Sequence, residues 1–144
     1  MILYLDTSAL IKRYVEEDKS EEVDNLWEEA IEIASSTVVF AESMATFCRK
    51  FREGVFSETE YIQTISEFKN EYHRFIIVPI SSELNRIIEE ILLKYPLRGF
   101  DSIHLASALL IQKNSNLNTI FACFDHSLNK AAEQEGLNVP FLER

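Results

Sequence analysis

Four acidic residues stand where predicted strands end or where predicted helices begin. Asp6 and Asp125 each follow directly on a short apolar run. Glu42 lies in the first turn after a second strand-like segment, and Asp101 opens a strongly apolar helix. If the strands are parallel, all four side chains come to one edge of a sheet, and this is the edge where open α/β folds bind their ligands.

Carboxylates gathered at one edge repel one another, and some of them take up protons unless a cation neutralises the group. Oxygen-only ligands favour a hard ion, Mg²⁺ or Mn²⁺, over zinc. Such an ion keeps several waters, bridges to phosphate groups and activates water for attack on a phosphodiester. The pattern therefore predicts metal-dependent phosphodiester hydrolysis by residues that are both metal ligands and catalytic groups: Asp6, Glu42, Asp101 and Asp125.

Helix capping is the simpler interpretation of each acid taken singly. An Asp before a helix commonly accepts hydrogen bonds from free backbone N–H groups of the first turn, and this applies to Asp6, Asp101 and Asp125. Glu42 alone would favour a helix start through the helix dipole. Only the joint placement of the four acids favours a metal site, so the capping alternative stays open for each residue.

Strand-like and helix-like segments alternate along the chain. The predicted strands are residues 2–5, 36–39, 75–80, 119–124 and an edge strand at 139–142. The predicted helices are residues 7–16, one that Ser20 caps, 41–53, one that begins near residue 57, 82–93, 103–111 and 127–135. The alternation predicts an α/β fold in which helices cover both faces of a mainly parallel sheet of four to five strands.

A helical hairpin is expected between the second and third strands. The turn around Gly54 is short, so its two flanking helices should be antiparallel. Ser57 and Glu60 form a capping-box pattern at the start of the second of these helices. Its predicted inward face consists of Tyr61, Ile62, Ile65, Phe68 and Tyr72.

The length of 144 residues is typical of one domain, and we expect residues 1–144 to form a single domain. Cys48 and Cys123 lie in apolar segments and are interpreted as core residues rather than as a disulfide or a zinc site. The first apolar run is too short to span a membrane, and no basic segment precedes it, so we expect neither a secretory signal nor an anchor. These features favour a cytoplasmic protein.

Net charge opposes a nucleic-acid partner. The chain has 14 Lys and Arg against 24 Asp and Glu, a net charge of −10, and a field of that sign repels phosphates. Binding RNA would therefore require a local basic rim. Candidates for RNA-binding residues lie on the helices that follow the first and second strands and just before Asp101: Lys12, Arg13, Arg49 and Arg98, with Lys50 and Arg52 beside them. A solvated helix face is the alternative for each of them.

Several motifs taken together resemble the PIN domain family. They are Leu5-Asp6-Thr7-Ser8-Ala9-Leu10, then Glu42, then Arg98-Gly99-Phe100-Asp101-Ser102-Ile103-His104-Leu105-Ala106, then Phe124-Asp125 with Leu128-Asn129 and Ala131-Ala132. More narrowly, the chain is similar to the VapC-type toxins of bacterial and archaeal toxin–antitoxin pairs. The resemblance spans essentially the whole chain and includes the helical hairpin.

The resemblance implies a PIN-like three-layer α/β/α sandwich and an endoribonuclease that uses Mg²⁺ or Mn²⁺, usually as a homodimer. The four acids would be its metal-cluster carboxylates. Ser8 would be a hydroxyl that orients a carboxylate or a water beside the metal, and Thr7 and His104 are assigned to the same surrounding layer. The implied partner, besides RNA, is a small antitoxin protein that inserts a segment, often with a basic residue, into the acidic groove.

Two residues near Asp101 have open interpretations. His104 lies three residues further along the same helix face, where it either contacts metal-bound water or phosphate, or is a buried histidine whose hydrogen bonds are satisfied. Arg98 either binds phosphate, holds a carboxylate, or is a plain surface arginine.

Other classes fit the sequence less well. A phosphotransfer receiver domain needs an Asp after its third strand, where this chain has Val78-Pro79-Ile80-Ser81, and a haloacid-dehalogenase-type phosphatase needs an Asp where this chain has Ser8. The serious alternative is a catalytically silent module that binds RNA or an antitoxin. The acidic net charge favours that alternative, whereas the complete set of carboxylates opposes it.

Overall fold

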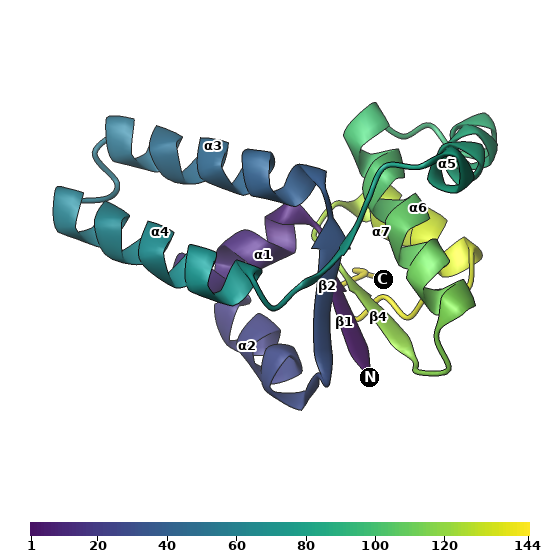
Figure 1. The fold of residues 1–144 in the computed structure, drawn as a ribbon, viewed down its shortest axis with the longest axis horizontal. Helices are drawn as coiled ribbons and strands as arrows, with labels where there is room; N and C mark the ends of the chain where they lie inside the picture. Colours follow the sequence, from purple (N-terminus) through teal and green to yellow (C-terminus); the bar gives the residue numbers. More distant parts are fainter.

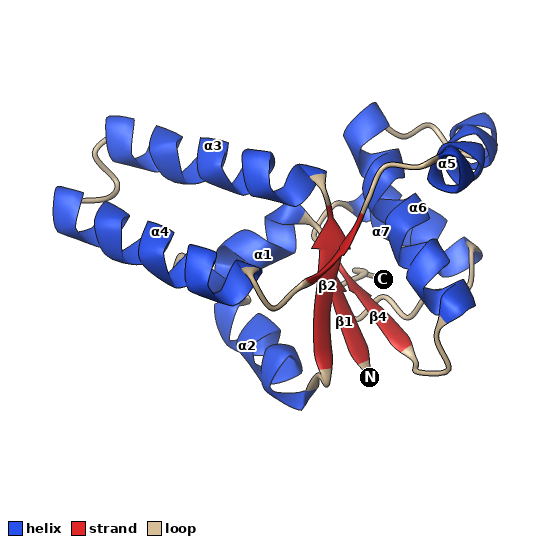
Figure 2. Cartoon of the chain, in the orientation of Figure 1, coloured by secondary structure: helices blue, strands red, loops and turns tan.

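The computed structural model describes residues 1–144 and contains one sheet. Its strands are β1 (Ile2–Leu5), β2 (Glu32–Ser36), β3 (Ile76–Val78) and β4 (Thr119–Ala122). Their order is β3-β2-β1-β4, and every neighbouring pair is parallel. All four strands therefore end at the same edge of the sheet, which is the upper end in Figure 2.

Helices cover both faces of this sheet (Figure 1). One face carries α1 (Thr7–Tyr14), α2 (Ser20–Glu29), α3 (Val38–Arg52) and α4 (Glu58–Tyr72). The other face carries α5 (Ser82–Lys94), α6 (Gly99–Asn114) and α7 (His126–Gln134). The predicted three-layer α/β/α architecture with a mainly parallel sheet is confirmed.

Side chains of β1 contribute to two separate hydrophobic cores, because successive residues of a strand point to opposite faces of the sheet. Leu3 and Leu5 are fully buried against α1 to α4, whereas Ile2 and Tyr4 are buried against α5 to α7. A strand buried on both faces explains the uninterrupted apolar run at the start of the sequence.

The hairpin of α3 and α4 extends from one side of the sheet, as Figure 1 shows. Ser57 Oγ accepts a hydrogen bond from the Glu60 backbone N–H at 3.1 Å, and Glu60 Oε1 accepts one from the Ser57 N–H at 2.9 Å, so the predicted capping box is present. Phe68, fully buried, is the centre of an aromatic cluster with ring centroids 5.5 to 5.7 Å away in Tyr14, Phe40, Phe47 and Tyr72.

The predicted inward face of α4 was wrong at one residue, Ile62. Ile62 is 58% exposed, because it lies about 100° around the helix from its neighbour Tyr61, which packs inward. Thr64 takes a buried position instead. The apolar stripe of α4 is therefore narrower than hydrophobicity alone suggested.

The second strand begins and ends earlier than predicted. Residues 36–39 were expected to be a strand, but β2 ends at Ser36 and Val38 begins α3. Pairing with β1 determines where β2 lies, since Ile2 to Tyr4 pair in register with Glu32 to Ala34. Glu42 consequently lies in the second turn of α3 rather than in its first.

Two smaller predictions were also wrong. The edge strand at 139–142 does not form, and only Asn138 bridges to Ile120 before the chain turns at Pro140. Ser20 does not cap α2; Lys19 is the N-cap, in a left-handed conformation with φ of 73°, and Ser20 Oγ instead donates to the Val15 carbonyl.

Both cysteines are free thiols, and the prediction that they are core residues is confirmed for Cys123, whereas Cys48 is only half-buried. Cys123 is fully buried, and Cys48 Sγ lies 3.4 Å from the Tyr61 hydroxyl. None of the helices is both long and apolar enough to cross a lipid bilayer.

Truncation of the aromatic centre should destabilise the protein strongly. We expect Phe68→Ala to lower the free energy of unfolding by roughly 3–5 kcal/mol, because the cavity it leaves is lined by rigid rings. Ile62→Ala on the same helix should change it by less than about 0.5 kcal/mol. Urea denaturation followed by circular dichroism measures both, and similar losses in the two variants would contradict this description of the core.

Candidate active site

All four predicted acids line one pocket of about 330 Å³ at the carboxyl edge of the sheet. Asp6 follows β1, Asp125 follows Phe124 shortly after β4, Glu42 projects from α3, and Asp101 lies in the first turn of α6. The remaining residues of the wall are Thr7, Ser8, Arg98, His104 and Phe124. Parallel strands thus bring together residues that are up to 119 positions apart in the sequence.

Asp6 and Asp125 are helix caps as well as pocket residues. Asp6 Oδ1 accepts hydrogen bonds from Ser8 Oγ at 2.7 Å and from the Ala9 backbone N–H at 3.0 Å. Asp125 Oδ1 accepts one from the Leu128 N–H at 2.8 Å. The capping alternative is therefore correct for both, but capping occupies only one oxygen of each carboxylate. Asp101 is not a cap, since α6 begins two residues earlier.

Glu42 is held from two other elements. Its Oε1 accepts hydrogen bonds from Thr7 Oγ1 at 2.6 Å and from His104 Nε2 at 2.9 Å. Burial raises the pKa of Glu42, but the hydrogen bonds from His104 and Thr7 outweigh burial and bring the pKa below its ordinary value. Glu42 is therefore a carboxylate at neutral pH.

Arg98 is the cation nearest the acids. Its Nε donates to Asp101 Oδ2 at 3.0 Å, and its guanidinium lies 4.0 Å from Asp125 Oδ2. The Arg98 side chain is 80% exposed, so its ion pairs contribute little to stability. Of the interpretations open for Arg98, holding a carboxylate is the one observed.

Each of the four carboxylates keeps one oxygen that accepts no hydrogen bond from the protein. These oxygens are Asp6 Oδ2, Glu42 Oε2, Asp101 Oδ1 and Asp125 Oδ2. No three acidic, histidine or cysteine side chains converge into a ready-made metal cage. The donor set nevertheless fits a hard ion such as Mg²⁺ or Mn²⁺, which takes one or two carboxylates and retains several waters.

Asp6 is the most deeply placed acid, with 6% of its surface exposed. Burial raises the pKa of Asp6 above its ordinary value, and the nearby Asp101 adds a smaller rise. The electrostatic effect of His104 and the hydrogen bonds from Ser8 and Ala9 offset this rise only in part. A negative charge at Asp6 is thus unfavourable unless a cation approaches it.

Ser8 and His104 contact the acids as well as other elements. Ser8 Oγ donates to Asp6 and accepts from the Phe124 N–H at 3.1 Å, so one hydroxyl links the ends of β1 and β4. His104 is 3% exposed, with both ring nitrogens hydrogen-bonded. The interpretation of His104 as a buried histidine with satisfied hydrogen bonds is therefore confirmed, and one of those bonds reaches the pocket acid Glu42.

Two residues of the site were missed in the sequence. Tyr4 forms a 2.9 Å hydrogen bond between its hydroxyl and His104 Nδ1, and Phe124 forms part of the pocket wall. The position of Phe124 beside Asp125 was a usable signal. Tyr4 gave none, because an aromatic residue in a buried strand is ordinary core.

A second pocket, of about 340 Å³, adjoins the acidic one and carries basic side chains. The two pockets share Thr7, Ser8 and Phe124 as walls, and the second one is also lined by Lys12, Arg49 and Lys50. Lys12 Nζ forms an ion pair with Glu17 at 3.1 Å and lies 4.7 Å from the centroid of the Phe124 ring. The structure thus brings two of the four predicted RNA-binding residues to this pocket, and Arg98 to the acidic one.

Arg13 is separated from both pockets. Its guanidinium forms ion pairs with Asp24 at 3.0 Å and Glu71 at 2.8 Å, and it stacks over Trp27 with 4.5 Å to the ring centroid. These contacts join α1 to α2 and α4, which gives Arg13 a structural role.

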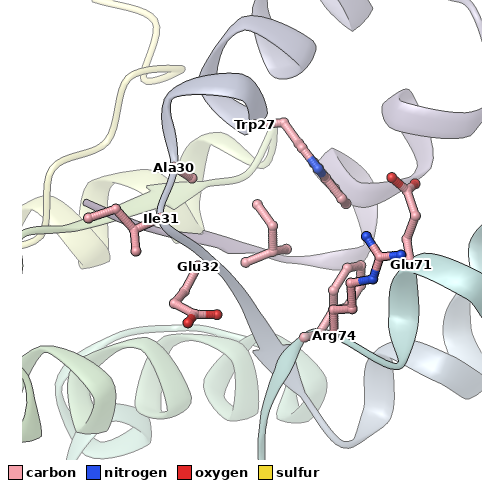
Figure 3. A pocket seen from close by; sticks show the side chains of 8 residues that line it. Trp27, Ala30, Ile31, Glu32, Glu71 and Arg74 are labelled. Atoms are coloured by element: carbon pink, nitrogen blue, oxygen red, sulfur yellow. The ribbon is translucent and has the colours of Figure 1, made fainter.

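A third pocket lies at the opposite, amino edge of the sheet. It measures about 280 Å³ and is lined by residues that include Trp27, Ile31, Glu32 and Arg74, as Figure 3 shows. It contains none of the four acids. Because ligands of open parallel sheets bind at the carboxyl ends of the strands, the acidic pocket is the better candidate for a functional site.

Removal of the buried charge should stabilise the protein in the presence of chelator. Because its pKa is raised, Asp6 binds a proton more tightly in the folded protein than in the unfolded chain. Ionised Asp6 therefore destabilises the fold at a pH above its folded-state pKa. This destabilisation disappears below the pKa of Asp6 in the unfolded chain, about 3.9. We expect Asp6→Asn to raise Tm at pH 7 by roughly 2–4 °C, the shift that about 1 kcal/mol produces.

Thermal unfolding with EDTA from pH 7 to pH 3.5 measures this difference, which should shrink as the pH falls. Asp125→Asn is the matched control, because the Asp125 side chain is 40% exposed and its charge is better solvated. A loss of stability in Asp6→Asn at pH 7 would show that the buried charge is not a penalty.

Comparison with known proteins agrees with this description. The PIN domain family model matches residues 3–134. Ribonuclease VapC45 of Mycobacterium tuberculosis is 24% identical over 138 residues, which cover 96% of this chain and 94% of that protein.

Solved structures share the fold at low sequence identity. The chain resembles VapBC2 from Rickettsia felis bound to a promoter DNA fragment, with a TM-score of 0.66, 16% identity and coverage of 96% of this chain and 97% of the other. It also resembles a toxin–antitoxin complex from Klebsiella pneumoniae, with a TM-score of 0.60, 18% identity and coverage of 85% and 86%. Since the family model covers nearly the whole chain, the protein belongs to the PIN domain family.

Proposed function

We propose that this protein is a metal-dependent endoribonuclease that hydrolyses RNA phosphodiester bonds. The observation that carries the proposal is the set of four carboxylates in one pocket, each with an oxygen that accepts no hydrogen bond from the protein. Asp6, Glu42, Asp101 and Asp125 would hold Mg²⁺ or Mn²⁺. Membership of the PIN family and the similarity to a ribonuclease support RNA as the substrate.

The chain's own residues prepare the acids for this role. Ser8 and the Ala9 N–H fix Asp6, while Thr7 and His104 fix Glu42. Arg98, exposed at the rim, can reach a phosphate next to Asp101 and Asp125. A bound divalent ion would supply an activated water and offset charge on the phosphate.

RNA would lie across the two adjoining pockets. Phosphates beside the cleaved bond would contact Arg49, Lys50 and Lys12, whose pocket continues from the acidic one through Thr7, Ser8 and Phe124. Such a local cluster of cations offsets the net charge of −10 where the strand binds.

The protein would act as the toxin of a type II toxin–antitoxin pair. Its structural similarity to a toxin–antitoxin complex supports a small antitoxin protein as its partner. We further propose that it forms a homodimer and works in the cytoplasm, where its two free thiols stay reduced.

Cleavage by the purified protein tests the proposal directly. A pool of cellular RNA should be cut with Mn²⁺ and left intact with chelator. Asp101→Asn should lower the rate by at least about 10²-fold while circular dichroism shows an unchanged fold, because the variant keeps the side-chain shape but loses the charge. Full activity in this variant would refute the assignment.

A catalytically silent module that binds RNA or an antitoxin is the second candidate. The net charge of −10 and the lack of a preformed metal cage favour it. Mn²⁺ distinguishes the two candidates, since a metal site stabilises the fold by about 2.7 kcal/mol at 100 times Kd. No Mn²⁺-dependent rise in Tm in the wild-type protein would favour the silent module.

Loss of the basic pocket should weaken RNA binding without affecting the metal. We expect the double variant Arg49→Ala/Lys50→Ala to raise the Kd for a short RNA by roughly tenfold at low salt, because two phosphate contacts are lost. Fluorescence anisotropy with Asp101→Asn as the background prevents cleavage during the measurement. Arg74→Ala, at the opposite edge of the sheet, is the control and should bind RNA normally.

A further inference from the structure

A chain of three hydrogen bonds runs beneath the acidic pocket. It starts at Tyr4 in β1, passes through His104 in α6 and reaches Glu42 in α3, which Thr7 in α1 also contacts. Tyr4 is fully buried and His104 is 3% exposed, so the path lies within the protein. It therefore links one half-exposed acid to three other elements of the fold.

The partners determine where the protons lie. Glu42 is a carboxylate and only accepts hydrogen bonds, so His104 Nε2 must carry the hydrogen that it donates. In the neutral imidazole, Nδ1 then accepts from the Tyr4 hydroxyl. Burial raises the pKa of Tyr4, so that hydroxyl keeps its proton. Each donor in this series of three hydrogen bonds thus has an acceptor.

The Tyr4 ring cannot easily turn away. It stacks on Phe121 with 5.5 Å between centroids, and it meets the His104 ring edge to face at 5.9 Å. Tyr4 thus fixes the orientation of His104. Tyr4 and His104 form a rigid support, whereas Glu42 alone has three rotatable side-chain bonds and would sample several positions.

We propose that His104, oriented by Tyr4, is a positioning residue that holds Glu42 Oε1 and directs Glu42 Oε2 toward a divalent metal. The inference rests on the proposed function. Donors that surround a metal ligand typically change metal affinity by 10- to 100-fold when they are removed. A buried histidine with a merely structural role would change stability but not metal affinity.

Mn²⁺ titration calorimetry on protein first treated with chelator tests the proposal. His104→Leu removes both hydrogen bonds and should lower the Mn²⁺ affinity by roughly 10- to 100-fold. His104→Gln, whose amide nitrogen can take the place of Nε2, should restore most of that affinity. Tyr4→Phe removes only the hydroxyl and should lower the affinity by a smaller factor.

Wild-type Mn²⁺ affinity in both His104→Leu and Tyr4→Phe would overturn the inference while leaving the proposed function standing. No Mn²⁺ binding by the wild-type protein would refute the proposed function and the inference with it. Failure of His104→Gln to exceed His104→Leu in affinity would also overturn the positioning role.

A second readout requires neither metal nor activity. In chelator, nitrogen-15 NMR of the histidine side chains should show His104 with its hydrogen on Nε2, in slow exchange with water. A neutral ring with its hydrogen on Nδ1 would overturn the inference, because that form cannot donate to Glu42.

Discussion

The gathering of four carboxylates at the carboxyl edge of the sheet, with Asp6 buried among them, is the constraint on which the rest of the site depends. Parallel strands bring Asp6 and Asp125 to the same edge, and α3 and α6 add Glu42 and Asp101. The protein reduces the repulsion by giving each acid at least one hydrogen-bond donor, yet the pKa of Asp6 remains above its ordinary value, chiefly because of burial. If the proposed metal binds, its charge would offset this cost.

Sequence patterns were sufficient for the architecture and for the identity of the acids. Strand and helix alternation predicted the sheet, and the apolar runs before Asp6 and Asp125 located the edge at which the four acids gather. The boundaries of strands and helices were less predictable where pairing between strands overrides the local preference of the residues for strand or helix. The β-branched residues after Ser36 favoured a strand, but pairing with β1 put the strand earlier and made Val38 the start of a helix.

Side-chain partnerships between different helices and strands could not be predicted from the sequence, unlike the local capping box of Ser57 and Glu60. Lys12 and Arg13 are neighbours in the sequence, but helical geometry sends Lys12 toward the basic pocket and Arg13 toward Asp24 and Glu71. Tyr4 was indistinguishable from its apolar neighbours until its hydroxyl was seen against His104. Such pairings depend on distances between elements, and periodicity along one element carries no information about them.

The basic pocket borders the acidic pocket on one side only, through Thr7, Ser8 and Phe124. If RNA binds as proposed, the two fragments produced by one cut are therefore held unequally. The fragment over Arg49 and Lys50 would keep more electrostatic contacts and dissociate more slowly than the fragment that contacts Arg98 alone. Turnover would then be limited by departure of the retained fragment, and added salt would accelerate it.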